Sequence, residues 1–169
     1  VKKLKNHYYE IQAGIGSHKN PELYGAFPTD AYSHTPEKSG AQQPGMTGQV
    51  KEDLITRFYE LGVTVSHGEI SFCPVLLKRN ELLSKPQSWN FSVGGEMQSE
   101  VLEAGSMAFT LCGVPVIYKM AQVSSIRVIT DQADPEHIPG NRLGAAWSRS
   151  LFRREKRVKK LIVELPAEK

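Results

Sequence analysis

The chain has 169 residues, of which 40% are hydrophobic and 23% are charged, as is usual for a globular protein. This length accommodates one domain, or a short segment followed by a compact domain. A net charge of +3 is too small to indicate nucleic acid or a membrane surface as a partner, and no apolar run reaches membrane-spanning length.

The chain begins at Val1 rather than at a methionine, and its first residues do not have the pattern of a signal peptide. We therefore expect a piece of a longer protein, whose compartment stays open, with the cytoplasm slightly favoured. Residues 1–16 fit either a short helix or an extended segment, because the spacing of Tyr8, Tyr9 and Ile11 suits both.

Residues 17–46 are rich in proline and glycine, with Tyr24, Phe27 and Tyr32 spread between them. A segment of this length without a regular element is unusual in a compact domain, and its aromatic content argues against disorder. We interpret it as a loop that wraps an active site.

The groups that could carry acid/base chemistry are scattered. Glu10 and Asp30 are candidates, but nothing in the sequence pairs them with each other. His7, His18 and His34 lie in the aromatic front region, and the five histidines show no metal-ligand spacing. The residues alone therefore predict no catalytic residue and no metal site.

The clearest helical pattern covers residues 50–61, where apolar side chains recur at the spacing of one helix face. Thr47 is the predicted N-cap, and Gly62 is suited to the left-handed residue that ends a helix. Glu52 and Asp53 are expected in the first turn, where negative charge favours the helix dipole. The members of the apolar face are Val50, Leu54, Ile55, Phe58 and Leu61.

A helix that starts at Thr47 and Gly48 exposes backbone N–H groups to which an anion can bind. An ordinary capped helix without a ligand has the same sequence features. The choice between these interpretations depends on the rest of the chain.

After this helix the pattern changes to short strands separated by turns. His67-Gly68 and Gly94-Gly95 are turn signals, Pro74 limits the strand before it, and residues 80–84 suit a helical turn. The predicted strands cover residues 63–65, 69–72, 89–93, 107–118, 126–129 and 160–165. We predict an α+β fold, in which a helix and a long loop precede a mainly antiparallel β-sandwich with residues 107–118 in its core.

Two further features have ordinary interpretations. Cys73 and Cys112 each follow apolar residues and are predicted to be small buried side chains rather than a disulfide or metal ligands. Basic residues crowd the segment 149–160, which we interpret as a solvated hairpin turn rather than a polyanion patch.

Four segments, in this order along the chain, carry a resemblance to a known family. They are Tyr9-Glu10-Ile11-Gln12, Met46-Thr47-Gly48-Gln49, Glu60-Leu61-Gly62-Val63 and Gly68-Glu69-Ile70-Ser71-Phe72-Cys73-Pro74. Together they resemble the C-terminal part of an inverting glycoside phosphorylase of the cellobiose phosphorylase type, or of a related (α/α)₆-barrel glycosidase. In that family a Thr-Gly precedes one of the last helices of the barrel, and a small β-sandwich closes the chain.

The resemblance implies a domain organisation and a site. Residues 1–67 would be the end of an (α/α)₆ barrel, with the loop and the final barrel helix, and residues 68–169 the C-terminal β-sandwich. Thr47 and Gly48 would contribute to a phosphate site, with Gln12 as the upstream glutamine of that site. Inorganic phosphate would be a co-substrate, an oligosaccharide the substrate, and no other cofactor is implied.

The family's catalytic aspartate and its phosphate-binding arginines belong to earlier parts of the barrel. The resemblance therefore implies that this chain is inactive alone and that its partner is the missing N-terminal part of the parent protein. Gln49 and the Gln42-Gln43-Pro44 run depart from the family pattern, so a hydrolase that uses water stays open. A non-catalytic sandwich for glycan binding or structural support also stays open, as does a homo-oligomer.

Overall fold

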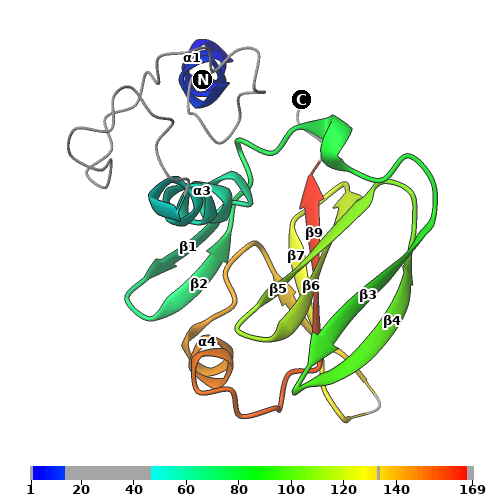
Figure 1. The fold of residues 1–169 in the computed structure, drawn as a ribbon. Helices are drawn as coiled ribbons and strands as arrows, with labels where there is room; N and C mark the ends of the chain where they lie inside the picture. The colour runs from blue at the N-terminus through cyan, green and yellow to red at the C-terminus, as the bar shows by residue number, and fades with distance from the viewer. Residues whose placement is uncertain (1, 14–46, 133, 167–169) are drawn as a thin grey trace. The chain divides into compact units, whose positions relative to one another are not determined.

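The computed structural model describes residues 2–13, 47–132 and 134–166, and for residues 11–13 and 47–53 it describes the backbone alone. The chain forms two compact units, residues 1–59 and residues 60–169 (Figure 1). In the second unit, short strands dominate, and the fold is α+β with a sandwich-like arrangement of mostly antiparallel strands, as predicted.

The described part of the first unit contains two helices: α1, Lys2–Ala13, and α3, Thr47–Glu60, whose last residue joins the second unit. The predicted helix over residues 50–61 is confirmed, but it starts three residues earlier. Glu52 and Asp53 therefore lie in its second turn, and the prediction that they occupy the first turn is wrong. Thr47 is the first helical residue, and the residue before it is outside the described part of the chain.

Gly62 ends this helix in the way that the sequence predicts. Its φ is +69°, and a Cβ at this position would lie 2.1 Å from the carbonyl carbon of Cys73. The Gly62 carbonyl accepts a hydrogen bond of 2.8 Å from the Cys73 N–H. Only a glycine combines a left-handed φ with such a close approach of two backbone segments.

Two hairpins follow. β1, Val63–Ser66, pairs with β2, Glu69–Phe72, through the predicted turn at His67 and Gly68, both of which have positive φ. β3, Gln87–Val93, pairs with β4, Glu96–Leu102, through Gly94 and Gly95. A 3₁₀ turn at Arg79–Glu81 lies between the hairpins, close to the helical turn expected at residues 80–84.

The remaining strands form one five-stranded sheet in the order β5-β6-β9-β7-β8. Its neighbours are antiparallel except β6 and β9, which run parallel. The strands are β5 Ser106–Leu111, β6 Val114–Ala121, β7 Ser125–Ile129, β8 Glu136–Pro139 and β9 Lys160–Pro166. The apolar run 107–118 is thus a hairpin, and its inward side chains are in the core, as predicted.

The sheet is covered on both faces, which makes the arrangement sandwich-like (Figure 1). On one face, Tyr118 of β6 packs on Phe72 of β2, with the rings at 85°, and Leu151 of the helix α4, Ala145–Phe152, joins the same core. On the other face the β3–β4 hairpin is tied to β9 by an ion pair of 2.6 Å between Lys160 and Glu100.

Two further sequence-based interpretations are wrong. The basic segment is not a hairpin turn, since it forms the last turn of α4 and the connection from there to β9, with Arg154 and Lys156 at positive φ. Cys73 is exposed rather than buried, because Phe72 points inward at the end of β2 and the next side chain alternates outward. Cys112 is half-buried and both thiols are free.

Candidate functional site

The predicted anion site lies at the start of α3. Thr47 and Gly48 are the first two residues of this 14-residue helix. The first four N–H groups of an α-helix have no partner within the helix, so the N–H groups of both residues belong to this set. That a phosphate binds to these groups stays a prediction, and so does the role of the Thr47 hydroxyl.

Gln12, the third predicted site residue, is the penultimate residue of α1. That Gln12 and Thr47 meet at one phosphate also stays a prediction. On the same helix, the Glu10 carboxylate lies 3.1 Å from Nδ1 of His7, one turn away, and both side chains are exposed. Asp30, His18, His34 and the loop over residues 17–46 lie outside the described residues.

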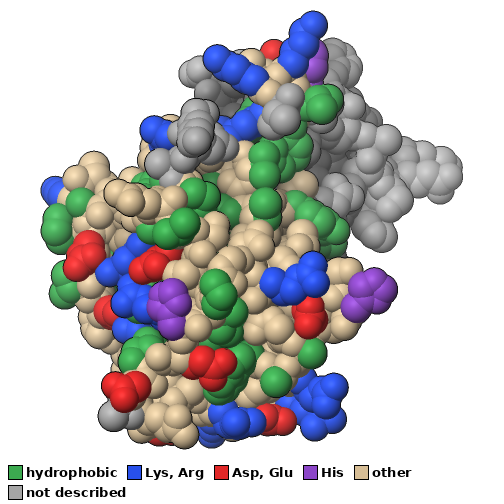
Figure 2. Space-filling view, turned by 180° about the vertical axis from the view of Figure 1, so that it is seen from behind, with side chains coloured by type: hydrophobic (Ala, Val, Ile, Leu, Met, Phe, Trp, Pro, Cys, Tyr) green, Lys and Arg blue, Asp and Glu red, His purple; other side chains and the backbone are tan. Residues whose placement is uncertain are grey.

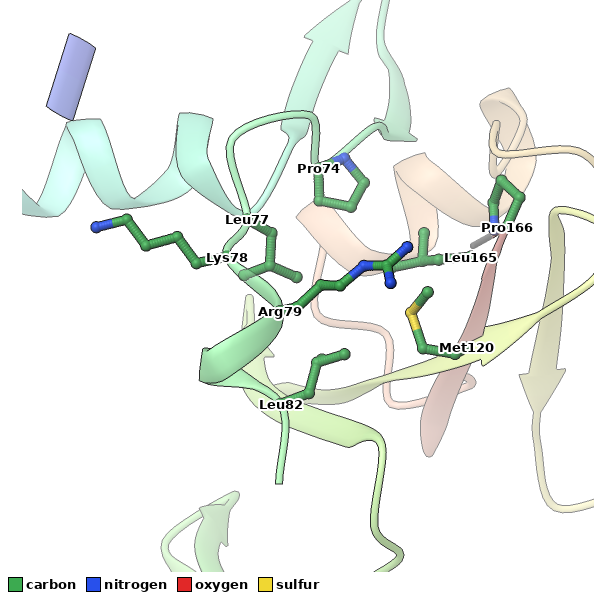
Figure 3. A pocket seen from close by; sticks show the side chains of 8 residues that line it. All are labelled: Pro74, Leu77, Lys78, Arg79, Leu82, Met120, Leu165 and Pro166. Atoms are coloured by element: carbon green, nitrogen blue, oxygen red, sulfur yellow. The ribbon is translucent and has the colours of Figure 1, made fainter. Parts of the chain in front are cut away.

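Three of the best-formed hollows on the second unit are lined by described residues. The first is small, about 60 Å³, and is walled mostly by apolar side chains (Figure 3). Figure 3 shows the Arg79 side chain reaching across it toward Leu165, while Lys78 points away from it. This hollow holds little beyond a water or two.

The second hollow, of about 250 Å³, lies where β3 and β4 meet β5. Trp89 lines it, and its ring lies 4.3 Å from the ring of Phe91, which is buried. Glu81 also lines this hollow, and its carboxylate accepts a hydrogen bond of 2.9 Å from the Lys78 N–H. This carboxylate helps to shape the 3₁₀ turn.

The third hollow is the largest, about 360 Å³, and it is polar. The loop after β7 provides one wall, Trp147 from the first turn of α4 another, and Arg157 from the connection to β9 a third. We call it the Trp147 hollow. Its lining residues are Thr130, Asp131, Gln132, Asp134, Glu136, Trp147 and Arg157.

Local contacts fix the aromatic wall of the Trp147 hollow. The indole N–H donates a hydrogen bond of 2.8 Å to the Glu136 carboxylate, and the Arg157 guanidinium lies 5.4 Å from the centre of the ring. Asp131, which also lines the hollow, forms an ion pair of 3.2 Å with Lys159. The Trp147 ring thus contacts one carboxylate, of Glu136, and one guanidinium, of Arg157. The hollow therefore contains hydrogen-bond acceptors as well as donors.

Tyr118 and Glu103 have clearly shifted pKa values, and both shifts arise from structural contacts. Burial raises the pKa of Tyr118, with a smaller contribution from Cys73, and the Tyr118 hydroxyl donates a hydrogen bond of 2.6 Å to the Leu61 carbonyl. The hydrogen bond and charge of Lys119 lower the pKa of the exposed Glu103, 2.8 Å away. Neither group lines any of the three hollows.

Among the described residues, no set of three or more His, Cys, Asp or Glu side chains is arranged to hold a metal ion. No helix in the described ranges is long and apolar enough to cross a membrane. Figure 2 shows basic and acidic side chains interspersed over the lower part of the face that it displays.

A scan against models of known protein families gives no match, and a comparison with curated proteins gives none either. The sequence did not single out the Trp147 hollow. Two features of the sequence could have indicated this site. They are the polar segment Thr130-Asp131-Gln132-Ala133-Asp134 and Trp147, which follows 13 residues after it. Nothing local in the sequence indicates that these segments meet.

Proposed function

We propose that this chain is the C-terminal part of a carbohydrate-active enzyme that cleaves β-glycosidic bonds with inversion, by phosphorolysis. The observation that carries the proposal is the start of α3 at Thr47 and Gly48, whose backbone N–H groups have no acceptor within the helix and can bind a phosphate. The order of the four family-like segments along the chain is a second support.

In the proposed reaction, a phosphate oxygen attacks the anomeric carbon from the face opposite the leaving sugar. The glycosidic carbon–oxygen bond breaks, and a general acid protonates the departing oxygen. The products are a sugar 1-phosphate of inverted configuration and the shortened oligosaccharide. The start of α3 would hold the phosphate, and the acid and the arginines would come from the N-terminal part of the longer protein.

The test uses the longer protein that contains the barrel. Thr47→Val keeps the shape of the side chain but removes the hydroxyl, so the KM for phosphate should rise about tenfold while the KM for the sugar changes less than about twofold. Thr64→Val, on the exposed side of β1, is the matched control and should change neither. Phosphate-dependent turnover with an unchanged phosphate KM in Thr47→Val would exclude this residue as a ligand.

The same titration separates phosphorylase from hydrolase. If water is the nucleophile, turnover does not depend on phosphate in either protein. The 169-residue chain by itself should release no sugar from β-glucosides, because the acid and the arginines would lie elsewhere. Robust turnover by the purified chain would refute the proposal that it is one part of the active enzyme.

A second candidate function is a non-catalytic β-sandwich that supports a partner domain. It is favoured by one observation: all members of the main core cluster lie between Leu61 and Leu165, within the second unit. In that case the longer protein has no glycosidic activity at all, with phosphate or with water.

A further inference from the structure

We propose that the Trp147 hollow is a saccharide-binding site on the second unit, residues 60–169, which we call the β-domain. It is built from residues other than those of the anion site at Thr47, and it does not depend on turnover. Its volume of about 360 Å³ falls within the range of small-ligand sites, about 300–1,000 Å³.

The mixture of groups in the hollow selects the class of ligand. Carboxylates of Asp131, Asp134 and Glu136 disfavour an anion, and the positive charges of Arg157 and Lys159 disfavour a polycation. A neutral sugar carries hydroxyls that both donate and accept, and one face of its ring consists of C–H groups. The site offers acceptors, donors and an aromatic ring, which match all three properties.

Some of the polar side chains that line the hollow form no hydrogen bond or ion pair with other described residues. Glu136 and Asp131 already bind Trp147 and Lys159, respectively. By contrast, the side-chain amide of Gln132 and the carboxylate of Asp134 have no partner among the described residues. These two residues line the same hollow as Trp147, and their side chains are the hydrogen-bonding groups that we assign to the sugar.

The indole is held in place before a ligand arrives. Its N–H is bound by Glu136, and the remainder of the side chain packs partly against the core. Because the ring is already fixed, binding costs little conformational entropy of the Trp147 side chain. The small favourable free energy of a C–H contact with a sugar is therefore retained. Arg157 stands over one face of the ring, so the C–H contact with a sugar is left to the part of the ring that lines the hollow, and the guanidinium adds donors beside it.

The experiment uses the whole 169-residue chain with Trp89→Phe, which leaves Trp147 as its only indole. The probes are glucose, galactose, cellobiose, cellotetraose, xylobiose and maltose, titrated to about 50 mM. We expect at least one to change the Trp147 fluorescence saturably and to shift its indole N–H resonance, with a Kd of about 0.1–5 mM. The absence of a saturable change with every probe would overturn the proposal.

Two variants locate the site. Asp134→Ala and Gln132→Ala remove exposed side chains without described partners, so the fold should persist while the Kd rises at least about fivefold. Glu96→Ala, which removes an exposed carboxylate on the β3–β4 hairpin, is the control and should leave the Kd unchanged. Equal affinities in all three variants would overturn the assignment. Binding without added phosphate, and without turnover, keeps this result separate from the function proposed for α3.

Discussion

At the scale of single residues, Gly62 imposes the tightest backbone constraint among the described glycines. The Cβ of an alanine would meet the backbone of Cys73 and Pro74 at 2.1–2.3 Å, and the φ of +69° is itself unfavourable. Gly62→Ala should therefore lower the free energy of unfolding by about 3 kcal/mol or more, measured by urea denaturation.

Gly68→Ala is the matched control for that change. Gly68 has a similar φ of +78°, but no atom lies within 4 Å of its Cβ position. Its cost should be limited to backbone strain, about 1–2 kcal/mol. Equal losses in the two variants would mean that the close approach of Gly62 to Cys73 contributes nothing.

Tyr118 is the second residue whose substitution should change the stability of the protein. Tyr118→Phe leaves the Leu61 carbonyl without its buried donor and should cost about 1–3 kcal/mol at neutral pH. Burial raises the pKa of Tyr118 above that of an unfolded tyrosine, about 10. The unfolded chain therefore loses this proton first, and the stability contributed by neutral Tyr118 is complete below about pH 10 and falls as the pH rises further.

The phenylalanine variant lacks this titration. The stability difference between wild type and Tyr118→Phe should narrow between about pH 9 and about pH 11, by as much as about 1.4 kcal/mol per pH unit above pH 10. Guanidinium denaturation at several pH values measures the difference. If the difference in the free energy of unfolding stayed constant over this pH range, the Tyr118 side chain would not be buried as a neutral phenol.

At the scale of elements, α4 is attached to the β1–β2 hairpin by one buried hydrogen bond. The Ile70 N–H donates to the Ser148 hydroxyl at 2.9 Å, and Ser148 is fully buried. Ser148→Ala should destabilise the fold by about 1–3 kcal/mol, because it leaves a strand N–H without a partner. The measurement is thermal unfolding followed by circular dichroism.

Ser150, on the same helix, provides an internal comparison. It is also buried, but its hydroxyl has no hydrogen-bond partner in the described part of the chain. Ser150→Ala removes an unsatisfied polar group and should be neutral or slightly stabilising. If Ser150→Ala proved as harmful as Ser148→Ala, the hydrogen bond to Ile70 would not be what attaches α4.

At the scale of the whole molecule, local patterns in the sequence predicted the hairpins. Gly94-Gly95 and His67-Gly68 supply the positive φ values that two-residue turns need, and these signals are read from adjacent residues. The helix over residues 50–61 was visible for the same reason, since its period and its terminal glycine are local features.

The elements that the sequence did not predict depend on distant partners. The parallel pairing of β6 with β9 joins segments on either side of β7, β8 and α4, so no local pattern encodes it. The helix α4 has only 8 residues and contains two serines, and it is stabilised by packing of Leu151 in the core. The Trp147 hollow combines residues of the loop after β7, of α4 and of the connection to β9, which explains why its residues were not recognised together.

The division into two units leads to the last prediction. The members of the main core cluster lie between Leu61 and Leu165, so a fragment of residues 60–169 contains that entire cluster. The fragment should show one cooperative thermal transition and dispersed amide resonances, with a midpoint within about 5 °C of the corresponding transition in the whole chain. Leu61→Ala, which opens a cavity at the start of this core, should lower the free energy of unfolding by about 2–5 kcal/mol in the fragment and in the whole chain.

A fragment without a cooperative transition would mean that the β-domain requires α3 to fold. It would also exclude the second candidate function in its simplest form, a sandwich that folds independently beside its partner.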